Sequence, residues 1–250
     1  IGGNLSVNNA GAGTTNNDIY IAGTGTVTVG GTSNIINNST GGGHSRIFIN
    51  ESSTNASTTF NGDVTFSNIS AAAGDVYFRN LRGTINFNGN VVVNNTATTA
   101  TGNNGIYLTW SSAWSGIETL AAGKTISVGA TGFSTGRLNL INFTQVGGTA
   151  QSLTLTGTTT ALQYGPNSSF GGNVTSVSPS LLFNGCTFSG TTNCTKNGTP
   201  NDQGSGSNIF TGVSVMNNSG SGYLMFGNGS RDQWLTDVTY NNTGSNIIYV

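Results

Sequence analysis

The sequence is poor in charged residues, and this scarcity excludes two classes of partner. Lys and Arg together number 7 and Asp and Glu together number 8, so charged residues make up 6% of the 250 residues. An ordinary soluble domain carries about 25%. The basic patch that nucleic-acid binding requires is missing, so we expect no nucleic-acid partner. No apolar run approaches the roughly 18 residues that a membrane span needs, so we expect no membrane span either.

Proline, histidine and cysteine are also scarce. Only 3 prolines occur, which is typical of a chain whose backbone N–H groups nearly all join strand ladders. His44, the single histidine, lies in the Gly-rich stretch GGGHSRIF and is expected to be solvated, which leaves no Ser-His-Asp constellation. Cys186 and Cys194 lie in CTFSGTTNC, which lacks zinc-site spacing. We expect them as buried thiols that fill the core, or as a disulfide in an oxidising extracellular space.

The apolar residues that are present recur in a nine-residue motif. FNGDVTFSN and WLTDVTYNN are two copies. Each copy begins with a large apolar residue, usually carries Gly at the third position and ends in Asn. Its odd positions share one face of a strand, because strand side chains alternate with a period of two. The copies begin at Ile1, Phe60, Phe87, Phe210 and Trp234.

A second motif, short and apolar, follows each copy, as in NDIYIAG and SRIFINE. Its equivalent positions, which we take as Ile19, Ile47, Val76, Ile106 and Leu138, recur with a loose period of about 28 to about 32 residues. One strand pair cannot bury its apolar face alone, whereas stacked copies bury a continuous column. The sequence therefore predicts an all-β, right-handed parallel β-solenoid (β-helix) of about 8–10 coils. A β-sandwich of short strands is the alternative, but it leaves the fixed order of the two motifs unexplained.

We expect residues 1–250 to form a single solenoid module. The chain opens on IGGNLSVNN, without Met or a signal-peptide pattern, and closes on SNIIYV within a strand pattern. We interpret both ends as cuts, and the chain as a fragment of a longer tandem-repeat polypeptide.

The ninth position of the motif is predicted to form an asparagine ladder in the core. In a stack of coils, a buried Asn amide can bond to the Asn above, to the Asn below and to turn backbone. A plain surface turn is the alternative for the same residues. The predicted ladder contains Asn9, Asn68, Asn95, Asn218 and Asn242.

The second motif also predicts a stripe of apolar side chains on the outside of the rod. If Ile19 and Ile21 point inward, Tyr20 points outward, and so do its equivalents. A contiguous apolar patch usually marks an interface. We therefore expect lateral packing against other solenoid chains or neighbouring repeats, with a glycan-stacking surface as an alternative. Triplets such as IYI leave open the reversed facing, in which the stripe is core. The candidate interface stripe is Tyr20, Phe48, Tyr77, Tyr107 and Met225.

Catalysis and metal binding are not indicated. Glycoside cleavage needs two carboxylates roughly 5–10 Å apart, and no acidic cluster is recognisable within neighbouring coils. We expect no catalytic residue, no cofactor and no metal site, although Ca²⁺ between coils stays undecided. A glycan-binding or glycan-cleaving β-helix, the competing hypothesis, predicts a solvent-open groove that holds Tyr77, Arg79 and Tyr107 with carboxylates nearby. An ice-binding face is less favoured, because Thr-x-Thr runs such as TVT at Thr26 are not expected in register over many coils.

Several segments resemble a known family. FNGDVTFSN at Phe60–Asn68, LAAGKTISVGATGFSTGRLNLINFTQ at Leu120–Gln145, LTLTG at Leu153–Gly157 and the segment Asn208–Val250 resemble the repetitive regions of very large surface proteins of Bacteroidota. The resemblance covers most of the chain and includes the order of the segments. Such proteins are similar to cargo of the type IX secretion route, and they include gliding adhesins and filamentous or hook-like appendages.

The resemblance implies an extracellular or cell-surface location and a structural or adhesive role without catalysis. It supplies no catalytic or binding residues. We therefore expect a non-catalytic module of an extracellular filament or giant adhesin, which acts by mechanical rigidity and lateral packing. Its expected partners are other solenoid chains and, in addition, cell-surface glycans or a prey or substrate surface.

Overall fold

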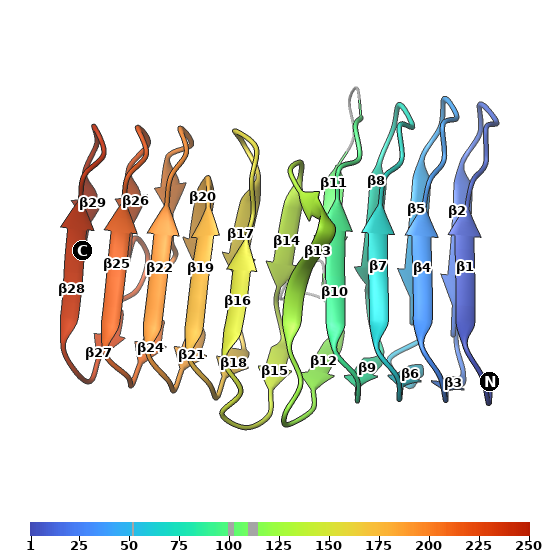
Figure 1. Cartoon of the computed structure of the whole chain (residues 1–250), viewed down its shortest axis with the longest axis horizontal. Coiled ribbons are helices and arrows are strands. Elements are labelled where there is room, and N and C mark those ends of the chain that lie inside the picture. Colours follow the sequence, from blue (N-terminus) through green and yellow to red (C-terminus); the bar gives the residue numbers. More distant parts are fainter. Residues whose placement is uncertain (52, 100–102, 110–114) are drawn as a thin grey trace.

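The protein is a parallel β-solenoid, as predicted. The computed structural model describes residues 1–51, 53–99, 103–109 and 115–250, and in these ranges every regular element is a strand. None of these residues forms a helix that could cross a membrane. All pairings between the strands are parallel, between strands of successive coils (Figure 1). A β-sandwich is built from antiparallel sheets, so that alternative is wrong.

Three long sheets and one short sheet form the walls of the solenoid. The strands of sheet A are β1 (Leu5–Asn9), β4 (Ser33–Asn37), β7 (Val64–Asn68), β10 (Val91–Asn95), β13 (Ile126–Phe133), β16 (Gln151–Thr154), β19 (Val174–Ser178), β22 (Thr192–Lys196), β25 (Ser214–Asn218) and β28 (Val238–Asn242). Those of sheet B are β2 (Asn17–Ile21), β5 (Ser45–Ile49), β8 (Val76–Asn80), β11 (Asn104–Tyr107), β14 (Arg137–Leu140), β17 (Ala161–Tyr164) and β20 (Ser180–Phe183).

Sheet C forms the third wall, and a short sheet D continues the face of sheet B in the last coils. Sheet C contains β3 (Thr26–Val29), β6 (Ser57–Phe60), β9 (Thr84–Phe87), β12 (Ile117–Leu120), β15 (Phe143–Gln145), β18 (Ser168–Phe170), β21 (Cys186–Phe188), β24 (Ile209–Phe210) and β27 (Gln233–Trp234). Sheet D contains β23 (Asp202–Gln203), β26 (Leu224–Met225) and β29 (Ile248–Tyr249).

The winding is right-handed. In Figure 1 the strands of sheet A run upward in front, the chain returns behind them, and each coil lies to the left of the preceding one. Sheet A has 10 strands, which agrees with the predicted number of coils. At the spacing of about 4.8 Å between strands, the stack is roughly 45 Å long.

The third wall corrects the interpretation of the nine-residue motif. Its first position belongs to sheet C, as Phe60 at the end of β6 shows, whereas its last five residues form a strand of sheet A. The corner Asn61–Asp63 separates the two. Alternation continues across this corner, because Phe60, Val64 and Phe66 are all fully buried. The strand period of two therefore predicted correctly which side chains point inward, but it gave no sign of the corner between sheets C and A.

The register of sheet B also differs from the prediction. Ile47 lies opposite Phe78, and Phe78 lies opposite Ile106, whereas Val76 lies opposite Ser45. Phe78 is therefore the equivalent residue, not Val76. The segment VYF in β8 is apolar at three successive positions, so its sequence could not distinguish the two registers.

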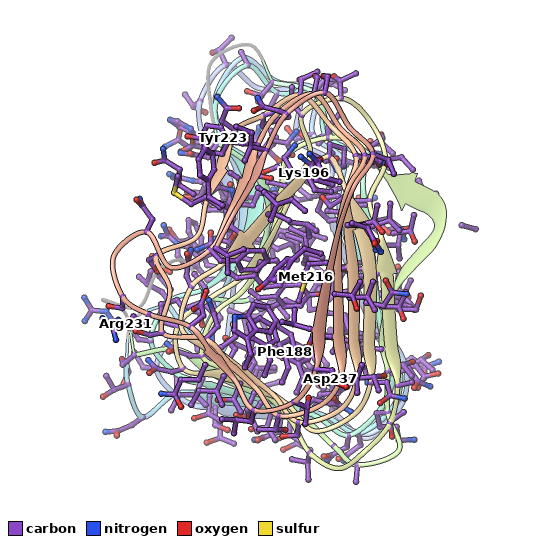
Figure 2. The ribbon with its side chains drawn as sticks, turned by 90° about the vertical axis from the view of Figure 1, so that its left-hand side faces the viewer. Phe188, Lys196, Met216, Tyr223, Arg231 and Asp237 are labelled. Atoms are coloured by element: carbon purple, nitrogen blue, oxygen red, sulfur yellow. The ribbon has the colours of Figure 1, made fainter. Side chains whose placement is uncertain are left out.

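One hydrophobic core runs the length of the stack. Its clearest feature is a column of aromatic rings from sheet C. Phe170 and Phe188 stack with ring centroids 5.4 Å apart, Phe188 and Phe210 at 5.0 Å, and Phe210 and Trp234 at 4.0 Å. Figure 2, which looks down the stack from its last coil, shows Phe188 and Met216 pointing into this interior. Coil-on-coil stacking thus converts a repeated apolar position into a continuous core.

Candidate functional site: the outer face of sheet B

The predicted stripe lies on the outer face of sheet B, but most of it is covered. Phe48, Tyr77 and Tyr107 form a cluster of their own, separate from the main core. Their exposed fractions are only 2%, 3% and 8%, whereas Tyr20 is 56% exposed. The expected exposed stripe is therefore wrong for three of its members. They point outward as predicted, yet they are buried within this single chain.

Arginines alternate with the aromatic residues and cover part of the cluster. One outward column of sheet B contains Tyr20, Phe48, Arg79, Tyr107 and Asn139, and the other contains Asp18, Arg46, Tyr77, Gly105 and Arg137. The Arg79 guanidinium carbon lies 4.7 Å from the ring centroid of Phe48 and 5.3 Å from that of Tyr77. The Arg46 guanidinium carbon lies 5.2 Å from the centroid of Phe48. Cations at such distances are attracted to the ring faces.

Carboxylates from neighbouring coils neutralise these arginines. Arg46 donates from Nε and Nη2 to the two carboxylate oxygens of Asp18, at 2.9 and 2.6 Å. This hydrogen bonding raises the pKa of Arg46 further. Arg79 donates from Nη2 to Glu51 at 2.8 Å. Burial raises the pKa of Glu51, and the charge of Arg79 partly opposes this effect. The pairs join successive coils and leave little net charge on this part of the face.

Tyr107 closes the cluster toward the middle of the stack. Its ring lies back over Gly105, where an added Cβ would be 3.0 Å from the ring. Its hydroxyl donates to the carbonyl oxygen of Asn104 at 3.1 Å. Burial raises the pKa of Tyr107 to about 12, so the phenol stays protonated at physiological pH. Glycine at position 105 is thus required for the ring to lie flat on the sheet.

A solvent-open hollow of about 500 Å³ lies beside Tyr107 on the same face. No carboxylate is among the described residues that line it. The exposed Arg137 donates from Nη1 to Gln163 Oε1 at 3.4 Å. Asn139 is 3% exposed, and its Oδ1 is buried without a hydrogen-bond partner. The lining residues are Asn103, Asn104, Tyr107, Gly136, Arg137, Asn139, Thr159 and Ala161.

The hollow differs from the groove that the glycan hypothesis predicted. It contains Tyr107, but neither Tyr77 nor Arg79 lines it, because these two side chains belong to the covered cluster. Of the carboxylates near these residues, Glu51 is paired with Arg79, and Asp75 accepts hydrogen bonds from Asn103. Sequence reasoning missed Arg137, although its place follows directly from the position of β14 in the second motif, and it took Asn139 only as a break in the outward apolar series.

Met225 does not belong to this cluster. It lies on β26 of sheet D, where its strand neighbours are Gln203 and Tyr249. Its side chain is half-buried. Several coils separate it from Tyr107, and the first two of them carry polar outward residues in this column, so the predicted stripe is not contiguous. Asn139 and Gln163 are two of these intervening residues.

The predicted asparagine column exists in two parts. In the first part, Asn9 donates to Asn37 Oδ1 at 3.2 Å, and Asn37 donates to Asn68 Oδ1 at 3.0 Å. The sequence reasoning overlooked Asn37. Asn95 follows in register and donates to the carbonyl oxygen of Thr135 at 2.8 Å. These four asparagines are buried.

Other residues interrupt the column before its second part. Phe133 lies opposite Asn95, and later Lys196 lies between Ser178 and Asn218. Asn218 is buried and donates to the carbonyl oxygen of Gly222 at 3.1 Å. Asn242, in the last coil, is exposed. Asn218 and Asn242 pair in register, but their amides donate to turn carbonyl oxygens, so among the predicted positions the bonds from one Asn to the next are local to the first coils.

Lys196 introduces a buried charge into that column. It is 0% exposed, and its ammonium group lies 3.9 Å from Asp202 Oδ2. Asp202 accepts hydrogen bonds from Ser180 Oγ at 2.5 Å and from the Leu181 N–H at 2.7 Å. Burial raises the pKa of Asp202 to about 6 and lowers that of Lys196. Figure 2 shows Lys196 near the top corner of the cross-section, on the inner side of the wall.

The two cysteines are free and buried, which corresponds to the buried-thiol alternative and not to the disulfide alternative. Cys186 lies on β21 of sheet C and Cys194 on β22 of sheet A. Each thiol has its own contact: Cys186 Sγ donates to the Gly165 carbonyl oxygen at 2.9 Å, and Ser176 Oγ donates to Cys194 Sγ at 3.0 Å. Burial raises the pKa of Cys194 to about 12. Both thiols therefore fill space in the core.

Sequence reasoning missed a second kind of ladder, at the corners. Before sheet B, His44 accepts the Asp75 N–H at Nδ1 (2.8 Å), and Asp75 accepts the Asn103 N–H (2.7 Å). Before sheet A, Asp63 accepts the Asn90 N–H at 2.8 Å in the same way. His44 is thus a partly exposed rung of a corner ladder and not a fully solvated loop residue. The recurrence of Asn or Asp at the fourth motif position was the available signal.

Threonines line up on the outer face of sheet C more than expected. Thr28 lies opposite Thr59, and Thr119 lies opposite Thr144. Asn86 interrupts the column between the two pairs. The neighbouring column ends in Ile117. The Thr-x-Thr pattern is therefore in register over part of the stack, but it does not form a broad array.

No cluster of three or more metal-ligating side chains occurs among the described residues. Comparisons of the chain with protein-family models, with curated proteins and with solved structures found no match.

Proposed function

We propose that the chain is a non-catalytic, rigid rod module of an extracellular filament or giant cell-surface adhesin. The observation that carries this proposal is the continuity of sheet A, whose 10 strands pair in one unbroken order along the stack. The resemblance to repetitive surface proteins of Bacteroidota agrees with such a role, and a type IX secretion route is part of the same proposal.

Rigidity follows from the direction of the hydrogen bonds. In a solenoid the bonds between coils run along the rod axis, so bending or stretching the rod acts on the ladders of all walls together. Side chains add bonds at the corners, as between Asp63 and Asn90, and ion pairs add further links, as between Asp18 and Arg46. Each net hydrogen bond is worth only about 1 kcal/mol. Their number per coil, and not the strength of any one bond, makes the rod stiff.

The outer face of sheet A supports lateral packing better than the aromatic cluster does. No charged residue points outward from its strands, so a second rod of the same kind meets little electrostatic repulsion there. β13 bulges out of this face, and its register shifts between Val93 and Asn95 of β10 (Figure 2). The bulge gives an otherwise regular face a distinct feature that a neighbouring rod must accommodate. The outward residues are Ser6, Asn8, Asn34, Ile36, Thr65, Ser67, Val92, Asn94, Ser127, Ser152, Thr154, Thr175, Val177, Asn193, Thr195, Val215, Asn217, Thr239 and Asn241.

Single-molecule stretching tests the mechanical role. One coil separates Ser176 from Cys194 by 18 residues, whereas a longer coil separates Asn90 from Thr125 by 35 residues. Released coil by coil, such lengths add about 60–125 Å of contour each, at about 3.3–3.6 Å per residue. A staircase with these increments is expected. Extension at low force without steps would show that the stack does not carry load.

A proline variant provides the control for that experiment. Thr175→Pro removes one backbone donor from the centre of sheet A, on the outward side of β19. It is expected to create an early rupture at that coil, whereas Thr175→Ser leaves the staircase unchanged. If both variants stretch alike, the ladders of sheet A do not determine the resistance.

A further inference from the structure

We propose that the hollow beside Tyr107 binds one carboxylated sugar unit of an acidic polysaccharide. This site does not depend on the mechanical role of the rod. The hollow measures about 500 Å³, which lies within the range of about 300–1,000 Å³ of small-molecule sites. It exists in part because Ala161, the strand neighbour of Arg137 in the next coil, has only a methyl side chain. Taller residues at Tyr107 and Arg137 form its walls.

Asn139 is the observation that points to a ligand. Its position on the outer face places it in the lining of the hollow, between Tyr107 and Gln163 in the same column. Its neighbours bury nearly all of it, since only 3% is exposed, and its Oδ1 has no partner. A buried polar atom without a hydrogen bond costs about 1–3 kcal/mol. A ligand hydroxyl that donates to this amide would remove that cost.

Arg137 is the one charged residue among the described residues that line the hollow. Its side chain is exposed, and its Nη1 makes one long contact, of 3.4 Å, to Gln163 Oε1. Arg46 and Arg79, by contrast, are engaged by carboxylates at 2.6 and 2.8 Å. The fork of N–H donors on a guanidinium matches a carboxylate with two parallel hydrogen bonds. The hollow therefore favours an anionic group at its Arg137 end.

The remaining polar groups favour a saccharide over a simple anion. Asn103 and Thr159 add an amide and a hydroxyl around the same space, whereas the side-chain amide of Asn104 is engaged by Asn95 and by the carbonyl oxygen of Ala97. Asn103 Nδ2 donates to Asp75 Oδ1 at 3.1 Å, so Asn103 offers its Oδ1 as an acceptor for a sugar hydroxyl, and Thr159 offers a hydroxyl that can donate or accept. Tyr107, whose hydroxyl is already bonded to Asn104, contributes a flat apolar wall. A carboxylate with adjacent hydroxyls on a ring, as in a uronic acid, combines these requirements.

Backbone amide NMR with short oligogalacturonates tests this assignment. We expect shift changes confined to residues around positions 103–107, 136–139 and 159–163, and binding at least about tenfold tighter than that of matched neutral galactose oligomers. Sodium acetate is the probe for a simple anion. If acetate binds as tightly as the uronate, or if acidic and neutral oligomers bind alike, the proposal is overturned. Shift changes elsewhere, or none at all, overturn it as well.

Two variants separate binding from folding. Asn139→Leu removes the unpartnered amide while keeping the volume, so it should abolish binding while leaving the melting temperature unchanged or higher. Arg137→Gln should remove the preference for the acidic oligomer and leave the neutral one unaffected. Arg231→Gln, at an exposed position just before β27 and several coils from the hollow, is the matched control for the loss of charge. Wild-type affinity in the Asn139→Leu protein would contradict the assignment.

Discussion

Glu118 gives this rod a stability that depends on pH, and Glu118→Gln should abolish that dependence. The side chain is 0% exposed. Oε1 accepts hydrogen bonds from Asn80 Nδ2 at 2.5 Å and from Thr109 Oγ1 at 2.7 Å, whereas Oε2 is buried without a partner. Burial raises its pKa from the ordinary 4.5 to about 8, because the two hydrogen bonds compensate only part of the lost hydration.

The sign follows from proton binding. Between about pH 4.5 and pH 8 the folded state holds the Glu118 proton more tightly than the unfolded chain does. The stabilisation is fully present below pH 4.5 and is lost as the pH rises through 8. The gap between the two pKa values corresponds to about 5 kcal/mol, at about 1.4 kcal/mol per pH unit. This figure is an upper bound, since structural relaxation and water entry reduce it.

The assay is denaturant unfolding of the wild type and of Glu118→Gln from pH 5 to pH 9. Glutamine keeps the Oε1 acceptor and cannot ionise, so the two proteins should differ little at pH 5. At pH 9 the variant should be more stable by several kcal/mol. Asp237→Asn, at an exposed carboxylate, is the matched control and should follow the wild type. Parallel curves for the wild type and Glu118→Gln would refute the reasoning, as would a Glu118 carboxyl carbon that titrates near pH 4.5 by NMR.

Four further perturbations have expected outcomes. Phe188 is fully buried between two stacked rings. Phe188→Ala should lower the free energy of unfolding, measured with denaturant, by about 3–5 kcal/mol. A loss under about 1 kcal/mol would mean that the coils collapse around the gap. Asn68→Ala, which deletes a rung of the buried column, should cost about 1–3 kcal/mol, whereas the exposed Asn241→Ala should be nearly neutral in the same assay. Asp202→Asn should remove the part of the stability that falls as the pH rises from about 4 to about 6, because burial raises this pKa; unchanged pH dependence would contradict that cause. Cys194 should react with a thiol reagent only after unfolding, since it is fully buried, and rapid labelling of the native protein would show that this coil opens.

The sequence predicted the fold because its repeat fixes which positions are buried, and not only which residue types are frequent. Buried positions such as Phe60 and Phe66 recur with the strand period, and only stacking buries such a face. The number of coils and the inward position of Asn68 followed from the same argument. The third wall was missed because the alternation continues through the corner between Phe60 and Val64 without a break in pattern.

The candidate site could be predicted only in part. Outward facing of Tyr77 and Tyr107 followed from alternation, but their burial did not, because it depends on residues of neighbouring coils. Arg79 covers two rings only because the register of sheet B places it opposite Phe48. Hydrophobic triplets carry no information on register, so the sequence could not set which side chains meet across coils.

The sequence by itself determined that this chain is a stack of parallel coils, since a repeated apolar strand pattern with little charge has no other way to bury its inner face. The tertiary structure alone decided which residues from different coils meet. The coils differ in length, as the spacings of 18 residues from Ser176 to Cys194 and 35 residues from Asn90 to Thr125 show. The spacing of residues in the sequence therefore does not determine which side chains lie in the same column along the stack. The register of the backbone hydrogen bonds between coils determines it. That pairing covers the aromatic stripe with arginines, buries Glu118 and leaves the hollow between Tyr107 and Arg137.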